Sequence, residues 1–252
     1  MTIILVVAAC AALMFLVELA KPGRQWPQVT GWWVRAGILN LIQIGAVFVA
    51  GAGWDRWMPG RSLWSLEHLS LSAQVLIGYL TITFIYYWWH RFRHESSLLW
   101  RLFHQVHHSP QRIEIVTSFY KHPFEILINS ILSSAILYLV CGVSPEAAGI
   151  TVLITGVAEL FYHWNVSTPY WIGFLFQRPE SHCVHHEQGH HQQNFSDLPL
   201  WDMLFGTFNN PRSWTANCGF SEDRETQLGA MLLTQDVNES ASKKNAPGGS
   251  AV

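Results

Sequence analysis

The sequence is short of charged residues. Asp, Glu, Lys and Arg together make up 13% of the 252 residues, whereas half of the residues are hydrophobic. An ordinary soluble domain carries about twice that share of charge, so this chain has too little charge to cover a soluble surface. The formal net charge is −2. Because basic residues are not in excess, we expect no nucleic-acid partner.

The chain also lacks paired cysteines. Its four cysteines are scattered along the sequence, and none belongs to a CxxC pair. This pattern indicates neither a disulfide framework nor a thiolate metal site. Cys183 lies inside a histidine motif, where we interpret it as a small packing residue and not as a ligand.

In place of charge, the chain has a series of long apolar segments. A helix that crosses a membrane needs about 20 such residues. The first segment is followed, not preceded, by basic residues, which is the wrong order for a signal peptide. We therefore predict membrane helices over residues 2–20, 35–54, 69–89, 124–143 and 147–162, of which the last is short for a span. The fold class that follows is all-α, a polytopic membrane bundle of about four to five transmembrane helices.

The basic residues predict how this bundle lies in the membrane. With five spans, 13 of the 15 Lys and Arg residues fall on one side, and only Arg56 and Arg61 fall on the other. Loops rich in Lys and Arg stay in the cytoplasm. We therefore predict a multi-pass integral membrane protein whose histidine-rich side faces the cytoplasm.

Histidines gather in one part of the chain. None of the 13 precedes His68 and none follows His191. Most fall in an HxxxH motif, two HxxHH motifs and FYHWN, each just beyond a predicted span on the same side. Residues three and four apart share a helix face, and neutral imidazole binds iron, zinc, copper and nickel. The convergence predicts a centre of two metal ions with the ligands His90, His94, His104, His107, His108, His182, His185 and His186, and with His163 as a ninth.

The same motifs resemble a known family. The stretch YYWWHRFRHESSLLWRLFHQVHHSP, with FYHWN, HCVHH and WDMLFGTF, is similar to the fatty acid hydroxylase and sterol desaturase superfamily of membrane histidine-box diiron oxygenases. The resemblance covers about residues 80–210. It implies a helical membrane core under a cytosolic histidine-rich helical cap, and a diiron centre that activates O₂ at a C–H bond. Carried over by position, the eight box histidines are the catalytic ligands and His163 is a further one.

Other residues near the motifs are assigned separately, and for some of them the sequence leaves two interpretations. Glu159 lies one helical turn before His163 and is either a ligand or a group that orients His163. His122 is expected to cap the fourth span or to support the ligands. We interpret His190 and His191 as a solvated pair in a variable loop, and His68 as lying on the opposite side from the cluster. Thr83 stands where many relatives carry an acid, and Gly206 is expected to end an amphipathic segment.

The chain divides into three expected units. Residues 1–68 form an N-terminal transmembrane helix pair, and residues 69–212 form the histidine-box catalytic core of membrane helices and cytosolic cap. Residues 213–252 form a polar C-terminal tail, whose end from residue 239 has the composition of a disordered segment.

The predicted function is that of a membrane-bound, O₂-dependent diiron oxygenase that hydroxylates or desaturates a lipid. The lipid is a sterol, a fatty acyl chain, an alkyl glycerol or a related molecule. Two iron ions are expected, with zinc as a possible occupant after purification. The chain has no flavin, haem or ferredoxin motif, so electrons must come from a separate reductase, ferredoxin or cytochrome. The basic patch of Arg91, Arg93, Arg101 and Arg112 is expected to be exposed and to contact lipid headgroups, or to dock an acidic electron carrier.

The alternative is a non-catalytic metal-binding or metal-transporting membrane protein. A transporter places ionisable residues inside its spans. The acidic residues within the predicted spans are only Glu18, Glu125 and Glu159, and the histidines lie at span ends. This distribution favours the enzyme.

Overall fold

A computed structural model of the chain describes residues 2–238, with side chains described from residue 9 onward except at position 222. Within that range the fold is helical, and the sole strand-like feature is an isolated bridge between Glu187 and Cys218. The predicted all-α class is confirmed. The helices of 12 or more residues are α1 (Thr2–Ala20), α2 (Trp32–Ala52), α4 (Leu71–Glu95), α7 (Pro123–Ser134) and α8 (Pro145–His163).

Short helices connect and cap these long ones. Two are π-helical, η1 (Trp100–His104) and η3 (Ala135–Cys141), and η3 continues α7 without a break. The others are α3 (Trp54–Trp57), α5 (Ser97–Leu99), α6 (Gln105–His108), η2 (Ile115–Thr117), η4 (Tyr170–Phe174), α9 (Pro179–His185), α10 (Pro199–Phe205), η5 (Glu222–Arg224) and α11 (Leu228–Leu232).

Three helical stretches among the described residues are long and apolar enough to cross a membrane. They are Trp32–Trp57, Leu71–Glu95 and Pro123–Cys141. The predicted first span is helical from Thr2 to Ala20, and its assessed part, Ala9–Ala20, is a shorter apolar helix. The predicted fifth span corresponds to α8, which is 19 residues long but is not among the three. The membrane bundle is therefore confirmed as a class, with three spans supported by length and composition.

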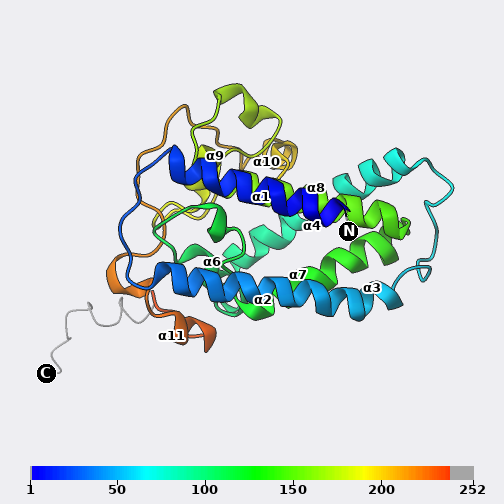
Figure 1. Cartoon of the computed structure of the whole chain (residues 1–252), viewed down its shortest axis with the longest axis horizontal. Helices are drawn as coiled ribbons and strands as arrows, with labels where there is room; N and C mark the ends of the chain where they lie inside the picture. The colour runs from blue at the N-terminus through cyan, green and yellow to red at the C-terminus, as the bar shows by residue number, and fades with distance from the viewer. Residues whose placement is uncertain (1, 239–252) are drawn as a thin grey trace, which may run out of the picture.

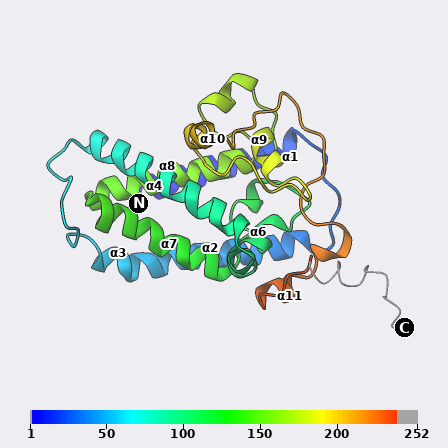
Figure 2. The ribbon, with the colours of Figure 1, turned by 180° about the vertical axis from the view of Figure 1, so that it is seen from behind.

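The long helices run along the longest axis of the molecule, and the short helices α6, α9 and α11 lie toward one end (Figures 1 and 2). Helix α4 packs against α8 and η3, and α2 packs against α7. The core between α4 and η3 includes Ile82, Leu137 and Tyr138. The approach is close at Gly78, where an added Cβ would lie 3.1 Å from Leu137 Cδ2.

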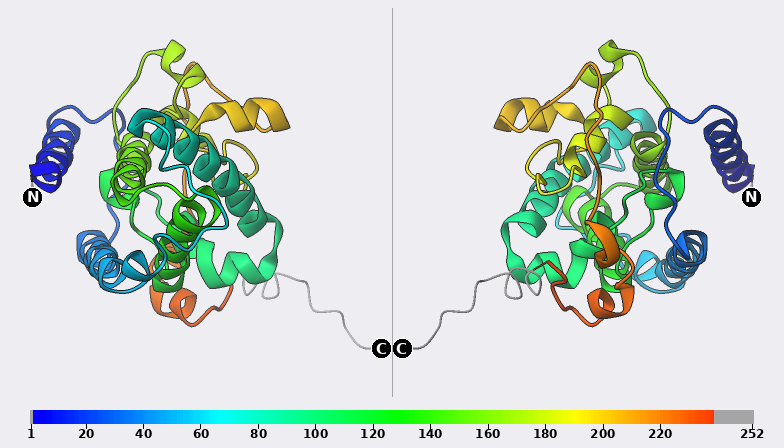
Figure 3. Two further views of the ribbon diagram at one scale, coloured as in Figure 1. Left: turned by 90° about the vertical axis from the view of Figure 1, so that its right-hand side faces the viewer. Right: turned by 90° about the vertical axis from the view of Figure 1, so that its left-hand side faces the viewer.

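Helix α1 stands apart from the other long helices in Figure 3. It is held to the rest of the protein by polar contacts near its carboxyl end. The buried carboxylate of Glu18 accepts the backbone N–H groups of Ile115 and Asn165, at 3.0 and 2.7 Å. The indole N–H of Trp164 donates to the Met14 carbonyl at 2.7 Å.

The flanks of the long helices are apolar. Leu13 on α1, Leu41 and Phe48 on α2, and Leu76 on α4 are all more than half exposed, and Phe48 reaches 74%. Water does not favour so much exposed apolar surface, whereas lipid tails cover it without loss. The exposed surface thus agrees with a protein embedded in a bilayer.

Residues 213–238 differ from the polar tail expected there. Met231 is fully buried, and Phe220 and Val237 are 3% exposed, in a core that also contains Trp32 of α2 and Val106 of α6. This part of the chain therefore covers the histidine-bearing end. The expected disorder beyond residue 238 lies outside the described residues, and the three-unit division remains a prediction.

Candidate metal centre

Four parts of the chain carry the nine predicted ligands to one place. Helix α4 continues past the predicted end of its span to Glu95, so that His90 and His94 lie one turn apart on the same helix. The first HxxHH motif spans the end of η1 and α6, His163 ends α8, and the second HxxHH motif lies on α9 and its C-cap.

The nine rings form two groups in which one ligand atom of each residue lies within 4.8 Å of all the others. Each HxxHH motif is shared between the groups, so that neighbouring histidines serve different sites. Group one consists of His90, His94, His104, His108 and His185, and group two consists of His107, His163, His182 and His186.

The rings of group one form a square with a cap. His90, His104, His108 and His185 occupy the corners, with adjacent ring centroids 4.5–4.7 Å apart. The ring of His94 lies 4.6–5.2 Å from all four. The centre of such a square is about 3.3 Å from each corner, which equals a metal–nitrogen bond of about 2.1 Å plus the radius of the imidazole ring. The spacing therefore fits one metal ion with five nitrogen ligands.

In both groups, ring nitrogens approach each other as ligands of one ion do. The Nε2 atoms of His104 and His108 are 3.1 Å apart, and those of His163 and His182 are 3.0 Å apart. Two nitrogens bound at right angles to one metal are separated by about 3.0 Å. Buried ring nitrogens without a hydrogen-bond partner include Nε2 of His90, His94, His185 and His186. Such orphaned atoms suit ligation by a cation.

Backbone carbonyls determine which ring nitrogen is free. Nδ1 of His90 donates to the Phe195 carbonyl at 2.7 Å, and Nδ1 of His185 donates to the Gln193 carbonyl at the same distance. Nδ1 of His163 donates to the Glu159 carbonyl at 2.9 Å. A carbonyl only accepts, so the proton sits on Nδ1 and Nε2 keeps its lone pair for a metal.

Glu125 orients His104 and was not among the predicted site residues. Its fully buried carboxylate lies 3.2 Å from Nδ1 of His104 and forms an ion pair with buried Arg93. The contact is the carboxylate–histidine arrangement that fixes metal ligands. The sequence contained one indication of Glu125, because this acid lies two residues after Pro123, in the first turn of α7. Gln177, whose side-chain amide lies 3.1 Å from Nδ1 of His182, had no such signal.

The rings are kept neutral. Burial lowers the pKa of His107 and of His182, and the charges of neighbouring histidines act in the same direction. Burial also lowers the pKa of His185 to about 3. Because metals bind the neutral imidazole, this environment favours ligation over protonation. The all-nitrogen donor set suits iron or zinc.

The contacts bear on two alternatives that the sequence left open. The Glu159 carboxylate pairs with Lys121 and belongs to neither group, whereas its backbone carbonyl orients His163. His122 caps α7, because its Nδ1 accepts the Phe124 N–H at 3.1 Å.

One predicted residue pair is wrong in part. His191 is only partly exposed: its ring lies 4.8 Å from that of His108 and 5.4 Å from Trp100, and its Nδ1 is buried without a partner. The backbone of His191 has a positive φ of 45°, and Gly189, two residues earlier, also has a positive φ. These left-handed conformations let the loop turn toward group one. His190 is bonded to the Gln193 side chain at 3.1 Å and contacts neither group.

The expected exposed basic patch of Arg91, Arg93, Arg101 and Arg112 is wrong for two of its four residues. Arg93 and Arg112 are buried, at 4% and 8% exposure, and pair with Glu125 and Glu114. Arg91 remains accessible but pairs with Glu95. Arg93 and Arg112 instead stabilise buried carboxylates, because the cap folds over both arginines.

The WDMLFGTF segment supports His90 indirectly. Gly206 ends α10 in the left-handed conformation, as predicted. Asp202 on α10 accepts the N–H groups of Phe195 and Ser196, at 2.8 and 2.9 Å. It thereby holds the loop whose Phe195 carbonyl orients His90. Thr83 accepts the Trp201 indole N–H at 3.0 Å, so it packs α10 on α4 and makes no recorded contact with His90.

Apolar helices of spanning length, with two adjacent groups of buried histidines at one end, define a helical membrane protein with a histidine-based metal-binding region. The family model for fatty acid hydroxylase matches residues 75–207, more than half of the chain. The chain belongs to the fatty acid hydroxylase family, and the predicted resemblance is confirmed.

Curated relatives are lipid-modifying enzymes. The chain is 30% identical over 146 residues to a sphingolipid C4-hydroxylase of Schizosaccharomyces pombe, a match that covers 56% of this chain and 50% of that protein. It is 32% identical over 147 residues to an ornithine lipid hydroxylase of Rhizobium tropici, covering 56% and 43%. An alkylglycerol monooxygenase of Danio rerio is 27% identical over 173 residues, covering 62% and 34%. The matches thus span about half or less of these relatives, and no solved structure matches the chain.

Proposed function

We propose that this protein is a membrane-bound, O₂-dependent diiron oxygenase that hydroxylates or desaturates a C–H bond of a lipid. The observation that carries the proposal is the pair of adjacent histidine groups with inward-facing bare nitrogens, in a member of the fatty acid hydroxylase family. The relatives named above act on sphingolipid, ornithine lipid and alkylglycerol substrates, which supports a lipid as the substrate here.

The nine histidines are the proposed ligands. Group one would hold one iron ion with five nitrogens, and group two would hold the second with four. An ion that accepts six ligands then keeps at least one position free in each group. Bound iron supplies the redox chemistry needed to activate O₂ and break an aliphatic C–H bond, which offers no acidic or basic handle.

The protein's own contribution is to orient and shield the rings. The carbonyls of Phe195, Gln193 and Glu159 hold three rings in the tautomer that presents Nε2. His104, His108 and His185 are at most 1% exposed, whereas His90 and His94 are partly exposed. Burial of most of the neutral rings strengthens the electrostatic contacts made among them.

The position of the site suits a substrate that stays in the bilayer. His90 and His94 lie on the last turns of α4, a helix of spanning length with an apolar flank. We propose a multi-pass topology with the histidine end in the cytoplasm, supported by the excess of Lys and Arg on that side. Electrons would come from a separate reductase, ferredoxin or cytochrome, because the sequence has no motif for a second redox group.

The test compares wild type with His107→Ala in the native membrane. Total lipid extracts are examined by mass spectrometry for species that gain one oxygen or lose two hydrogens, and metal is measured in the purified proteins. We expect the modified lipid with wild type and its absence with His107→Ala. His190→Ala is the matched control, because this histidine lies outside both groups, and it should retain the product.

Identical lipid profiles for wild type and His107→Ala, with two metal ions in the wild type, would contradict an oxygenase. That outcome would favour the alternative of a non-catalytic metal-binding protein. The contacts already count against transport, because Glu18, Glu125 and Glu159 all have structural partners within the protein.

A further inference from the structure

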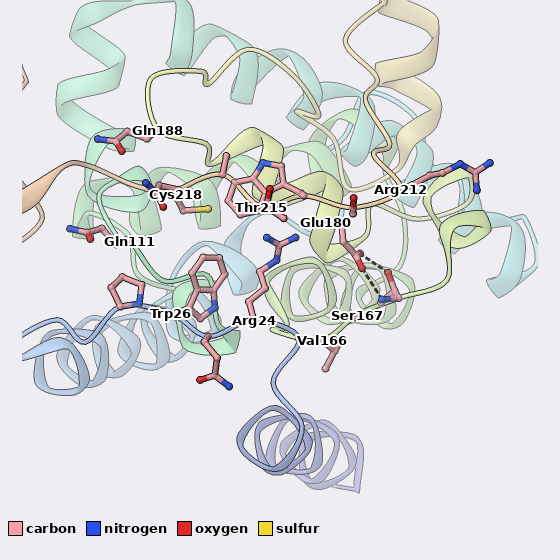
Figure 4. Close-up of a pocket in the computed structure, with 18 of the residues that line it drawn as sticks. Arg24, Trp26, Gln111, Val166, Ser167, Glu180, Gln188, Arg212, Thr215 and Cys218 are labelled. Atoms are coloured by element: carbon pink, nitrogen blue, oxygen red, sulfur yellow. Dashed lines mark hydrogen bonds between the residues drawn. The ribbon is translucent and has the colours of Figure 1, made fainter.

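A cavity lies on the histidine-bearing end of the protein, and none of the nine histidines lines it. Its volume is about 810 Å³. Three segments form most of its wall: the linker between α1 and α2, the loop after α8, and residues 212–221 (Figure 4). Gln111, Glu180 and Gln188 complete it. The function proposed above makes no use of this cavity.

Two arginines line the cavity, Arg24 and Arg212, and Arg212 stacks over the Tyr170 ring at 4.5 Å. The Arg24 guanidinium stacks over the Trp214 ring at 4.3 Å and lies 6.0 Å from Trp26. Figure 4 shows it pointing into the space between the linker and Thr215. The Asn165 side chain makes two hydrogen bonds with the backbone of Arg24. Its Oδ1 accepts the Arg24 N–H and its Nδ2 donates to the Arg24 carbonyl, each at 2.9 Å. The Arg24 side chain is therefore positioned before any ligand arrives.

Among the described residues, no carboxylate forms an ion pair with Arg24. Glu180, the acid in the cavity wall, is already engaged by Arg178 and by the backbone N–H and hydroxyl of Thr168. The cavity thus offers a guanidinium without an ion-pair partner, which suits an oxyanion.

The linker places this cavity at the level of a helix end. Residues 21–31 connect the apolar helix α1 to α2, and α2 begins a stretch of spanning length at Trp32. Helix ends of spanning segments lie among lipid headgroups, where tryptophan and arginine are favoured. An oxyanion carried by a lipid headgroup would therefore reach Arg24 without leaving the interface.

We propose that this cavity binds a phosphate-type oxyanion at the Arg24 guanidinium, carried by an anionic lipid headgroup or by a small free anion. The site is independent of the oxygenase proposal, since none of the proposed metal ligands lines it. A planar guanidinium held on an aromatic face recognises such a group with two parallel hydrogen bonds.

The experiment titrates the purified, metal-containing protein in neutral detergent. The probes are inorganic phosphate, short-chain phosphatidylglycerol, and short-chain diacylglycerol as a lipid without phosphate, with binding followed by calorimetry. We expect saturable binding of at least one phosphate-bearing probe and none of diacylglycerol. Arg24→Gln should weaken that binding about tenfold or more, and Arg24→Lys should weaken it less, because Lys keeps the charge but not the paired donors.

Lys21→Gln is the matched control. Lys21 is exposed in the same linker and does not line the cavity, so its loss should leave binding within about twofold. Binding of phosphatidylglycerol alone identifies a headgroup site, and equal binding of inorganic phosphate identifies a site for a free anion. No saturable binding of either probe, or equal losses in Arg24→Gln and Lys21→Gln, would overturn the proposal. Unchanged metal content shows that the Arg24 variants are folded.

Discussion

At the scale of single residues, the candidate centre depends on which atom of each histidine carries the proton. A carbonyl or carboxylate partner on Nδ1 leaves Nε2 bare and fixes the ring plane. His90, His104, His163 and His185 each have such a partner. The histidine motifs do not indicate these partners, because three of them are backbone carbonyls outside the motifs. One, that of Glu159, lies one turn before its histidine, and the other two lie farther away in sequence.

The Glu125 contact makes a first prediction. Glu125→Gln removes the charge that pairs with Arg93 and leaves His104 only a neutral amide oxygen as acceptor, so metal affinity should fall about tenfold to a hundredfold. Metal content is measured by elemental analysis after dialysis against graded chelator. Glu95→Gln removes an exposed carboxylate from the end of α4 and should bind metal as wild type does. Equal affinities in all three proteins would show that Glu125 does not orient a ligand.

Glu159 makes a second prediction at this scale. Its carboxylate pairs with Lys121 and only its backbone contacts His163. Glu159→Gln should therefore keep the full metal content, whereas His163→Ala should lose metal from group two. Elemental analysis of both purified variants decides the matter. Loss of one metal ion from Glu159→Gln would instead make the carboxylate a ligand.

At the scale of elements, each HxxHH motif serves both groups. His104 and His108 lie four residues apart and face group one, while His107 between them faces group two. On α9 the assignment is reversed, because His182 and His186 face group two and His185 faces group one. Two short helices are thus enough to bridge both candidate sites, and a shift of either helix would disturb both.

The packing of α4 on α8 makes a third prediction. A Cβ at Gly78 would lie 3.1 Å from Leu137 Cδ2 and 3.2 Å from Thr151 Oγ1, whereas one at Gly156 would meet nothing within 4 Å. Gly78→Val should destabilise the protein by about 1–3 kcal/mol through overpacking. Gly156→Val should change little. Thermal unfolding in detergent measures both, and equal midpoints would mean that the helices are not closely packed at Gly78.

At the scale of the whole molecule, the centre joins parts of the chain that are far apart in sequence. Ligands come from α4, the η1–α6 segment, α8 and α9. Metal binding would therefore hold the ends of the long helices together. Removal of metal by chelation should lower the thermal midpoint of the protein, and readdition of iron should restore it.

The metal-free protein should also become acid-sensitive. Histidines of the unfolded chain take up protons below about pH 6.5, whereas burial lowers the pKa of His185 to about 3 in the folded protein. The unfolded state then binds more protons, so stability falls as pH drops from 7 to 5, by at most about 1.4 kcal/mol per pH unit for each such histidine. Burial also raises the pKa of Asp197 to about 7 and that of Asp202 to about 6, which acts in the opposite direction, but fewer carboxyl groups than histidines are shifted. A midpoint at pH 5 equal to that at pH 7 would contradict this.

The sequence by itself determined the helical membrane class, the family and the nine histidines that the fold brings together. Long apolar segments and motif spacing are local properties, and local spacing decides helix faces and span ends. Only the tertiary structure decided how the nine rings divide into five and four. It also buried Arg93 and Arg112, turned His191 toward group one, and packed Phe220 and Met231 under the cap. Each of these depends on contacts between residues distant in sequence, where partner and burial are set by the packing of other segments.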